Sequence, residues 1–387
     1  MPEKLKENIY WVGAIDWNIR DFHGYETKNG STYNSYLITD EKVVLIDTVK
    51  HYLFDEFLDR IKKIIDPKKI DYIVVNHVEM DHSSSLEKII KISNAKIITN
   101  EKAKEHLNLH YDTTNWEFII VDSNDSLNIG KKNLKFIKTP MLHWPDNMVT
   151  YAIEDKILFS NDAFGQHIAS FERYDFEVDG CIESAKEYFA NILLPYKSLI
   201  PNAIKTVDSL NIDLVCPSHG VIWKKDVQKI KECYLKWASN EVLEKAVIVY
   251  DSMYGSTEKI GCSIAEGLVE GGISVKIFKL SRSDISAIMN EIIDAKYVLI
   301  GSPTLNINIY PEVAKFLKYM EGLKPSKKIA VAFGSYGWAE SATLHIKNIF
   351  NNISFENVDD ECLTVRFVPK EEDLKKCYEF GKKLSKM

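Results

Sequence analysis

The order of apolar and polar residues changes character once along the chain, near residue 243. Before that point, short runs rich in Ile, Val, Tyr and Phe lie between loops that hold Asn, Asp, Gly and Pro, which is typical of strands. Many strands with helices outside them favour two packed sheets flanked by helices, an αββα sandwich over residues 1–243. The predicted strands are 34–40, 42–48, 70–76, 95–100, 134–140, 148–155, 156–161 and 212–218, and the predicted helices lie near 52–64, 84–92, 101–107, 183–204 and 225–240.

After residue 243, strands and helices alternate strictly. Five strands joined by crossover helices predict an α/β domain over residues 244–387, with a doubly wound, five-stranded parallel sheet. The predicted strands are 245–250, 274–280, 297–302, 327–335 and 363–369, and the predicted helices are 257–270, 284–293, 311–320, 338–350 and 370–385.

The composition limits the class of protein. The chain has 387 residues, of which 45% are hydrophobic and 27% charged, and its net charge of −7 offers no basis for binding nucleic acid. The N-terminus has no apolar core of signal-peptide length, and no apolar run is long enough to span a bilayer. The six cysteines show no paired spacing, so we expect reduced thiols and a cytoplasmic protein with no membrane partner.

Metal-binding residue types gather where strands end. The stretch "NHVEMDHSSS" begins at residue 76, directly after a predicted strand, and contains two histidines and two carboxylates. Three more such residues follow the ends of other predicted strands. One loop histidine alone is usually structural, but four strand ends sharing this habit by chance is a poor explanation, so we expect all seven to converge on one metal site. The candidate metal ligands are His77, Glu79, Asp81, His82, His143, Asp162 and His219.

The spacing resembles the H-x-H-x-D-H motif of the metallo-β-lactamase superfamily, with Glu79 in place of the second histidine. The carboxylates of Glu79, Asp81 and Asp162 carry a charge of −3, which nearly balances two divalent ions. Zinc prefers nitrogen and sulfur ligands, whereas a carboxylate-rich N/O set favours iron or manganese. Asp162 is placed to bridge two ions about 3.5–4 Å apart.

A phosphate cradle is predicted where the second domain begins. The stretch "DSMYGSTEKI", residues 251–260, joins the first strand to its helix and offers serine and threonine hydroxyls beside the N–H groups of the helix N-terminus. There is no Walker lysine and no G-x-G-x-x-G motif, so ATP and NAD are poor candidates. Taken alone, the stretch is explained equally well by an ordinary capped helix.

Two further loops, "GSPTLN" at 301–306 and "GSYGWAE" at 334–340, follow the third and fourth strands, where this fold binds its ligand. Trp338 either stacks on a flavin ring or packs at the start of a helix. Together the three loops resemble flavodoxin with FMN, although Tyr254 stands where many flavodoxins carry Thr. The candidate FMN-binding residues are Ser252, Met253, Tyr254, Gly255, Ser256, Thr257, Pro303, Thr304, Asn306, Ser335, Tyr336, Gly337 and Trp338.

The whole chain resembles the flavodiiron proteins, also called A-type flavoproteins. The motifs are H-x-E-x-D-H at 77–82, "LHWPDNM", "FSNDAFGQH", "PSHG" and the flavodoxin-like loops. The resemblance implies reduction of O2 to water, or of NO to nitrous oxide, at a di-iron site that FMN supplies with electrons. It assigns His77, Glu79 and His143 to one iron and Asp81 and His219 to the other, with Asp162 bridging. It leaves the role of His82 open and makes His167 a structural residue or a neighbour of the ligands.

The resemblance also implies the electron path. Two ferrous ions and a reduced FMN hold the four electrons that O2 needs. In the family, FMN and iron lie at opposite ends of one protomer, so a head-to-tail homodimer, or a tetramer of two such dimers, is expected. The donor is rubredoxin or reduced deazaflavin coenzyme F-420. The stretches "DWNIRDFHGYET", "LHWPDNM" and "FSNDAFGQH" are similar to the methanogen type and favour F-420.

Other interpretations stay open at this point. A di-zinc hydrolase with a flavodoxin-like binding domain is opposed by Glu79, because it replaces a nitrogen ligand by a carboxylate. A non-catalytic electron carrier is opposed by the complete set of seven candidate ligands. Nothing in the sequence chooses between O2 and NO, or between a dimer and a tetramer.

Overall fold

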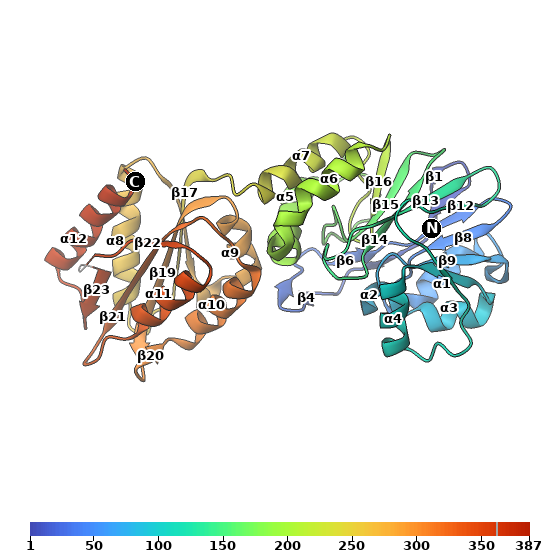
Figure 1. The fold of residues 1–387 in the computed structure, drawn as a ribbon. Coiled ribbons are helices and arrows are strands. Elements are labelled where there is room, and N and C mark those ends of the chain that lie inside the picture. Colours follow the sequence, from blue (N-terminus) through green and yellow to red (C-terminus); the bar gives the residue numbers. More distant parts are fainter. Residues whose placement is uncertain (361–362) are drawn as a thin grey trace. The chain divides into compact units, whose positions relative to one another are not determined.

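The computed structural model describes residues 1–360 and 363–387, which form two compact units (Figure 1). The first unit comprises Met1–His23, Thr27–Phe189 and Tyr196–Leu235. The second comprises Gly24–Glu26, Ala190–Pro195 and Lys236–Met387. The second unit therefore begins slightly before residue 244 and includes two short segments from the first half of the chain. The domain limits 1–243 and 244–387 stay a prediction.

The first unit contains two large sheets. In the first sheet, the strand order is β1-β2-β7-β8-β9-β10-β11, and in the second it is β12-β13-β14-β15-β16. The strands of the first sheet are β1 (Glu3–Lys6), β2 (Ile9–Trp11), β7 (Tyr36–Thr39), β8 (Val43–Ile46), β9 (Tyr72–Val74), β10 (Lys96–Thr99) and β11 (Phe118–Ile120). Those of the second are β12 (Ser126–Asn128), β13 (Asn133–Lys138), β14 (Met148–Ala152), β15 (Ile157–Asn161) and β16 (Leu214–Pro217).

Alternation along the strands explains why the two sheets stack. In β8, Val44 and Ile46 are buried between the sheets against residues such as Phe136, whereas Leu45 faces the opposite way, into a core with the helices. Each such fully buried side chain stabilises the fold by about 1.5–3 kcal/mol. The outer core holds side chains of α1 (Phe54–Lys62), α3 (Leu86–Ser93) and α4 (Glu101–His110). The predicted sandwich is confirmed.

The predicted helix at 183–204 is wrong as a single element. It consists of α5 (Cys181–Tyr188), a π-helical turn at Phe189–Leu193, a 3-10 stretch at Leu194–Leu199, and α6 (Ile200–Asp208). Pro195 has no N–H to donate within a helix, and Pro201 is tolerated because it lies in the first turn of α6. Helix α7 (Val227–Ala238) follows, and Figure 1 shows α6 and α7 beside β15 and β16.

Several short strands among residues 1–243 were not predicted, because two to four residues carry too little periodicity. Besides β1, β2, β11 and β12, they are β3 (Ala14–Asp16), β4 (Asp21–Phe22), β5 (Tyr25–Glu26) and β6 (Ser31–Tyr33), which form two small ribbons, β3-β6 and β4-β5. A short helix, α2 (Met80–Ser83), follows β9.

The second unit contains the predicted parallel sheet. Its order is β18-β17-β19-β21, formed by β17 (Leu243–Tyr250), β18 (Ser274–Lys279), β19 (Ala295–Leu305) and β21 (Ile329–Tyr336). The prediction of five strands needs a correction. The last position is shared by β22 (Glu356–Asn357) and β23 (Thr364–Arg366), which pair with opposite ends of β21, and β20 (Asn308–Ile309) adds an antiparallel turn to β19.

Helices cover both faces of this sheet. Helix α8 (Ser256–Glu270) and helix α12 (Glu371–Leu384) pack together on one face, where Ile264 and Phe380 join the core. The remaining helices are α9 (Ile285–Ile292), α10 (Pro311–Leu323) and α11 (Ala342–Asn352), which lie on the other face in Figure 1. The carboxyl ends of β17, β19 and β21 are thereby left open at one edge of the sheet. Within the described residues, no helix is long and apolar enough to cross a membrane.

Candidate functional site

The seven predicted metal ligands come together in the first unit. They form two groups, and within each group the potential ligand atoms all lie within 4.8 Å of one another. Asp81 and His82 lie on the short helix α2, and the other five residues lie on loops. All seven follow the ends of β9, β13, β15 and β16, so convergence at strand ends explains the site. The first group is His77, Glu79, His143 and Asp162, and the second is Asp81, His82 and His219.

Asp162 joins the two groups through its two carboxylate oxygens. Oδ2 lies 3.3 Å from Nε2 of His143 and 3.7 Å from Nε2 of His77. Oδ1 lies 3.1 Å from Nε2 of His82 and 3.5 Å from Nε2 of His219. One carboxylate therefore faces both groups, which is the geometry a bridging ligand requires.

Two imidazole rings, those of His77 and His219, are oriented by a hydrogen bond from Nδ1. Nδ1 of His77 lies 2.7 Å from a carboxylate oxygen of Asp146, and Nδ1 of His219 lies 2.8 Å from the carbonyl oxygen of Thr32. Both partners only accept, so in each ring Nδ1–H is the donor. The Nε2 atoms of both rings are then free to offer a lone pair to a metal ion held among the carboxylates of the groups.

The donor set fits two cations. Three buried carboxylate oxygens lack a hydrogen-bond partner among the described residues: Oδ1 and Oδ2 of Asp81, and Oδ2 of Asp162. A buried carboxylate oxygen without a donor is costly unless a cation satisfies it. Around a metal with ligand bonds of roughly 2.1 Å, neighbouring ligand atoms lie about 3.0–3.4 Å apart. Nε2 of His219 lies 3.1 Å from Oδ2 of Asp81, and Nε2 of His143 lies 3.3 Å from Oε2 of Glu79.

The pKa shifts of the histidines and carboxylates also indicate that the two groups require positive charge. Burial opposes a charge on His143, yet the adjacent carboxylates of Asp162 and Glu79 outweigh it and raise the pKa of His143 to about 9. In the same way, Asp162 and Asp81 raise the pKa of His219 to about 10 against its burial. Burial likewise opposes a charge on Glu79, but hydrogen bonds with His143, His23 and His77 hold its pKa far below the usual range. Without a metal, protons supply the positive charge that these carboxylates require.

The structure places His82 within the second group. Its Nε2 lies 3.3 Å from Oδ2 of Asp81 and 3.1 Å from Oδ1 of Asp162, and the ring is buried. His82 is therefore positioned like the other ligands. His167 lies outside both groups: its Nδ1 lies 2.8 Å from Oγ of Ser31, and burial holds the pKa of His167 well below its usual value.

Three residues near the ligands were not assigned a role from the sequence. Asp146 holds His77 and belongs to the quoted motif "LHWPDNM", so its place beside His143 was a usable signal. Tyr188 donates its hydroxyl to Oδ1 of Asp162 over 3.1 Å, and Nε2 of His23 lies 3.2 Å from Oε1 of Glu79. His23 belongs to the quoted stretch "DWNIRDFHGYET", whereas none of the quoted motifs contains Tyr188.

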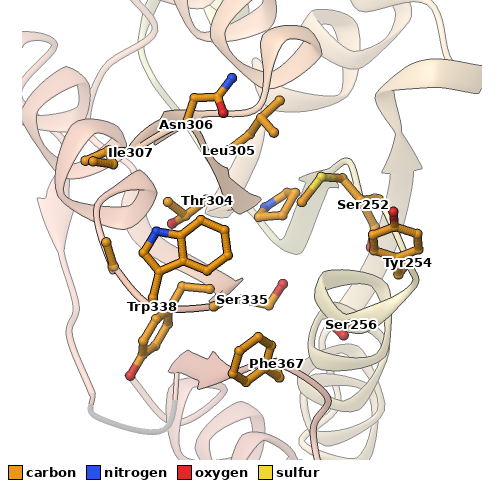
Figure 2. A pocket seen from close by; sticks show the side chains of 15 residues that line it. Ser252, Tyr254, Ser256, Thr304, Leu305, Asn306, Ile307, Ser335, Trp338 and Phe367 are labelled. Atoms are coloured by element: carbon orange, nitrogen blue, oxygen red, sulfur yellow. The ribbon is translucent and has the colours of Figure 1, made fainter.

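The second unit holds a cavity of about 360 Å³ at the carboxyl ends of its strands (Figure 2). All the predicted FMN-binding residues line it except Gly255 and Thr257. Gly255 instead makes the turn before α8 at a positive φ of 86°, and its N–H donates to Oγ of Ser252 over 2.9 Å. Oγ1 of buried Thr257 lies 3.0 Å from Oγ of Ser335. Four lining residues were missed: Leu305, Ile307, Ala339 and Phe367.

Trp338 does not pack at the start of a helix. Helix α11 begins at Ala342, and the side chain of Trp338 lies on the loop after β21 with 86% of its surface exposed. Figure 2 shows Trp338 and Tyr254 on opposite sides of the cavity, with Ser252 and Ser256 near Tyr254. Tyr254 is 95% exposed. Two aromatic rings that face a cavity with hydroxyls at one end fit a flat aromatic ligand that carries a phosphate.

Two family models match the chain, one described as ODP family beta lactamase over residues 32–220 and one as flavodoxin over residues 248–381. An uncharacterized protein of Methanocaldococcus jannaschii is 65% identical over 100% of this chain and 98% of its own length. A nitric oxide reductase of Moorella thermoacetica is 43% identical over 99% of this chain and 98% of its own.

Two solved structures share the entire fold. The rubredoxin oxygen:oxidoreductase from Desulfovibrio gigas has a TM-score of 0.96 and 38% identity, and the match covers 100% of this chain and 98% of that one. The flavodiiron protein from Giardia intestinalis has a TM-score of 0.97 and 37% identity, with 100% and 96% covered.

Proposed function

Because this chain belongs to the flavodiiron proteins, oxidoreductases that pair a di-iron centre with FMN, we propose that it reduces O2 to water with electrons from reduced coenzyme F-420. The electrons pass through FMN to the metal groups. The observation that carries the proposal is the pair of ligand groups that share Asp162, since a two-metal site needs a carboxylate with one oxygen for each metal.

The ligand assignment follows from the two groups. His77, Glu79 and His143 would hold one iron, Asp81, His82 and His219 would hold the other, and Asp162 would be shared by both. Two ferrous irons and a reduced FMN would supply the four electrons that, with four protons, convert O2 to two waters. Three carboxylates among the ligands favour iron over zinc, because zinc prefers nitrogen and sulfur donors.

The surrounding residues orient the ligands and keep bulk water away. Asp146 and the carbonyl of Thr32 hold His77 and His219 with Nε2 toward the groups. Tyr188 keeps its proton, because burial raises the pKa of its hydroxyl well above the usual value. The hydroxyl donates to Oδ1 of Asp162, so its proton is held beside the carboxylate that the two groups share.

The FMN assignment rests on the cavity of the second unit. Ser252 and Ser256 lie at its end near the N-terminus of α8, where N–H groups and the helix dipole attract a phosphate. Trp338 and Tyr254 are placed to cover the isoalloxazine ring. The cavity residues do not enclose that ring on their own, as the exposure of both aromatic side chains indicates.

A head-to-tail homodimer is part of the proposal, or a tetramer built from two such dimers. In this arrangement, the FMN of one chain passes electrons to the irons of its partner. Dilution to monomers should then abolish turnover although each chain keeps both cofactors. The measurement is activity per chain over a concentration series, together with the oligomeric state. A monomer with both cofactors that works at the full rate would overturn the arrangement.

A second candidate function is reduction of NO to nitrous oxide with rubredoxin as donor. The relative from Moorella is named a nitric oxide reductase, and the structure from Desulfovibrio is named a rubredoxin oxygen:oxidoreductase. The substrate and the donor are therefore separate questions for this chain. We propose reduced F-420 as the donor and O2 as the substrate, because the motifs around Asp16, His143 and Asp162 are similar to the methanogen type.

We also propose a cytoplasmic location.

One experiment separates these candidates. The purified protein is assayed with O2 and with NO, each with reduced F-420 and with reduced rubredoxin. We expect fastest turnover with O2 and F-420, and no peroxide release. Faster turnover with NO, or with rubredoxin, would establish the second candidate. Metal and flavin analysis of the same sample tests the cofactors: two irons and one FMN per chain are expected, and zinc in place of iron would overturn the assignment.

A further inference from the structure

A chain of hydrogen bonds runs from the ligand His77 to helix α4. Oδ2 of Asp146 lies 2.7 Å from Nδ1 of His77, and Oδ1 of the same carboxylate lies 3.2 Å from Nδ1 of His106. Asp146 is fully buried, whereas the side chain of His106 is 23% exposed. One carboxylate therefore connects a metal ligand to a residue that reaches the surface.

His106 donates to a different oxygen of Asp146 from the one that His77 contacts. Because a carboxylate only accepts, both His77 and His106 donate through Nδ1–H. Oδ2 also accepts from the backbone N–H of Val78 over 3.0 Å. Oδ2 thus has two donors, whereas the side-chain donor to Oδ1 among the described residues is His106. Loss of His106 would leave the carboxylate held at one oxygen and able to turn about that point.

Helix α4 holds Asp146 by a second contact. The N-cap residue Asn100 accepts from the N–H of Ala103 over 3.0 Å, and its Nδ2 donates to the carbonyl oxygen of Asp146 over 2.6 Å. The helix therefore fixes the main chain of Asp146 through Asn100 and the carboxylate through His106. The orientation of the carboxylate is set by the helix as well as by the metal ligand.

We propose that His106 is a positioning residue of the first metal group, which holds Asp146, and through it the ring of His77, in the orientation that binds the metal. The proposal rests on the ligand assignment made above. An imidazole whose Nδ1–H is anchored keeps its Nε2 lone pair aimed at the metal, so the metal does not have to orient the ring on binding. Partners of this kind typically contribute about 10–100-fold to metal affinity.

The test uses substitutions at His106 in the full-length protein. His106→Ala removes the donor, and His106→Asn keeps one, because Nδ2 of asparagine stands at the same bond distance from the backbone as Nδ1 of histidine. His110→Ala is the matched control, since His110 is an exposed histidine one turn further along α4. Alanine favours helix more than histidine does, so a loss in His106→Ala does not come from helix propensity.

The readout is the affinity for Fe²⁺, measured by anaerobic titration of the metal-free protein. We expect His106→Ala to weaken one of the two iron sites by about tenfold and to leave the other unchanged. His106→Asn should recover most of the loss, and His110→Ala should bind like the wild type. Equal affinities in His106→Ala and the wild type, with or without a lower melting temperature, would overturn the proposal. So would an equal loss in the alanine and asparagine variants.

A double variant tests whether His106 acts through Asp146. Asp146→Asn should weaken the same iron site, and adding His106→Ala should cost little more, because the partner of His106 has already changed. Full additivity of the two losses would overturn the proposal. The wild-type titration separates this inference from the ligand assignment: failure of the wild type to bind two irons refutes the assignment, whereas normal wild-type binding with an unchanged His106→Ala variant refutes only the inference.

Discussion

The residues of the metal groups are mostly buried, whereas the cavity of the second unit is flanked by two exposed aromatic side chains. Asp162 is 1% exposed and His77 has no exposed surface, while Trp338 and Tyr254 are 86% and 95% exposed. Around the metal, ligands such as His77 and His219 are fixed by a further hydrogen bond. Around the cavity, the loops after β17, β19 and β21 supply most of the lining residues.

The difference has a physical origin. A buried carboxylate or imidazole without partners is costly, so a metal site inside a protein must be ordered before the metal binds. An exposed aromatic side chain carries a smaller cost and gains contacts when a flat ligand covers it. We therefore expect substitutions in the metal groups to abolish iron binding and leave FMN binding unchanged. Substitutions in the cavity should weaken FMN binding and leave iron binding unchanged.

The largest effect is expected for Asp162→Ala. It removes the one ligand that both groups share, so both irons should be lost. The fall in iron affinity should exceed the roughly 10–100-fold that follows loss of a residue that only holds a ligand in place. FMN content should remain that of the wild type, because Asp162 belongs to the first unit. Iron and flavin analysis of the purified variant provides the measurement. Retention of one tightly bound iron would show that the groups are independent and would refute the bridging role.

Glu79→His should have the next largest effect, since it restores the H-x-H-x-D-H pattern. Loss of one carboxylate raises the charge of the site by one unit and favours nitrogen-rich zinc coordination. We expect weaker iron retention and no O2 reduction, with FMN still reducible. Glu79→Gln, which removes the charge without adding a nitrogen ligand, is the control. Unchanged oxidase activity in Glu79→His would refute the role assigned to Glu79.

The metal-free protein should lose stability as the pH rises. Histidine in an unfolded chain titrates near 6.5, whereas the pKa of His143 is raised to about 9 and that of His219 to about 10. The native metal-free state therefore binds more protons than the unfolded state above pH 6.5, and unfolding becomes easier up to about pH 10. Thermal melts from pH 6 to 10 measure this. With iron bound, the metal replaces these protons, so a loaded sample that follows the same decline would contradict the account.

The smallest effect is expected for Trp338→Ala. Aromatic stacking contributes about 0.5–1.5 kcal/mol, so FMN binding should weaken by roughly two- to tenfold, with both irons retained. Electron transfer from flavin to iron should slow as well. Trp17→Ala is the control, because Trp17 is a partly exposed tryptophan of the first unit that packs on Phe171. FMN titration that shows equal affinities in all three proteins would remove Trp338 from the flavin site.

The candidate site was largely visible in the sequence. The ligand residues follow the ends of apolar, β-branched runs, and a polar residue at a strand end is displayed at the edge of a sheet. That local rule was enough to select all seven residues of the two candidate metal groups and most of the residues that line the cavity. Where a strand is only two or three residues long, as in β4 or β20, the local signal is too weak, and those strands were missed.

Tertiary structure decided what depends on distant partners. Tyr188 reaches Asp162 from the last position of α5, and His106 reaches Asp146 because α4 packs beside the loop that carries it. Phe367 lines the cavity because β23 pairs with the end of β21. The sequence by itself determined which residue types stand at each strand end, since that is a local pattern. Which side chain meets which carboxylate was decided only by packing, because it depends on residues 26 to 69 positions apart in the chain, as for Tyr188 with Asp162 and for His77 with Asp146.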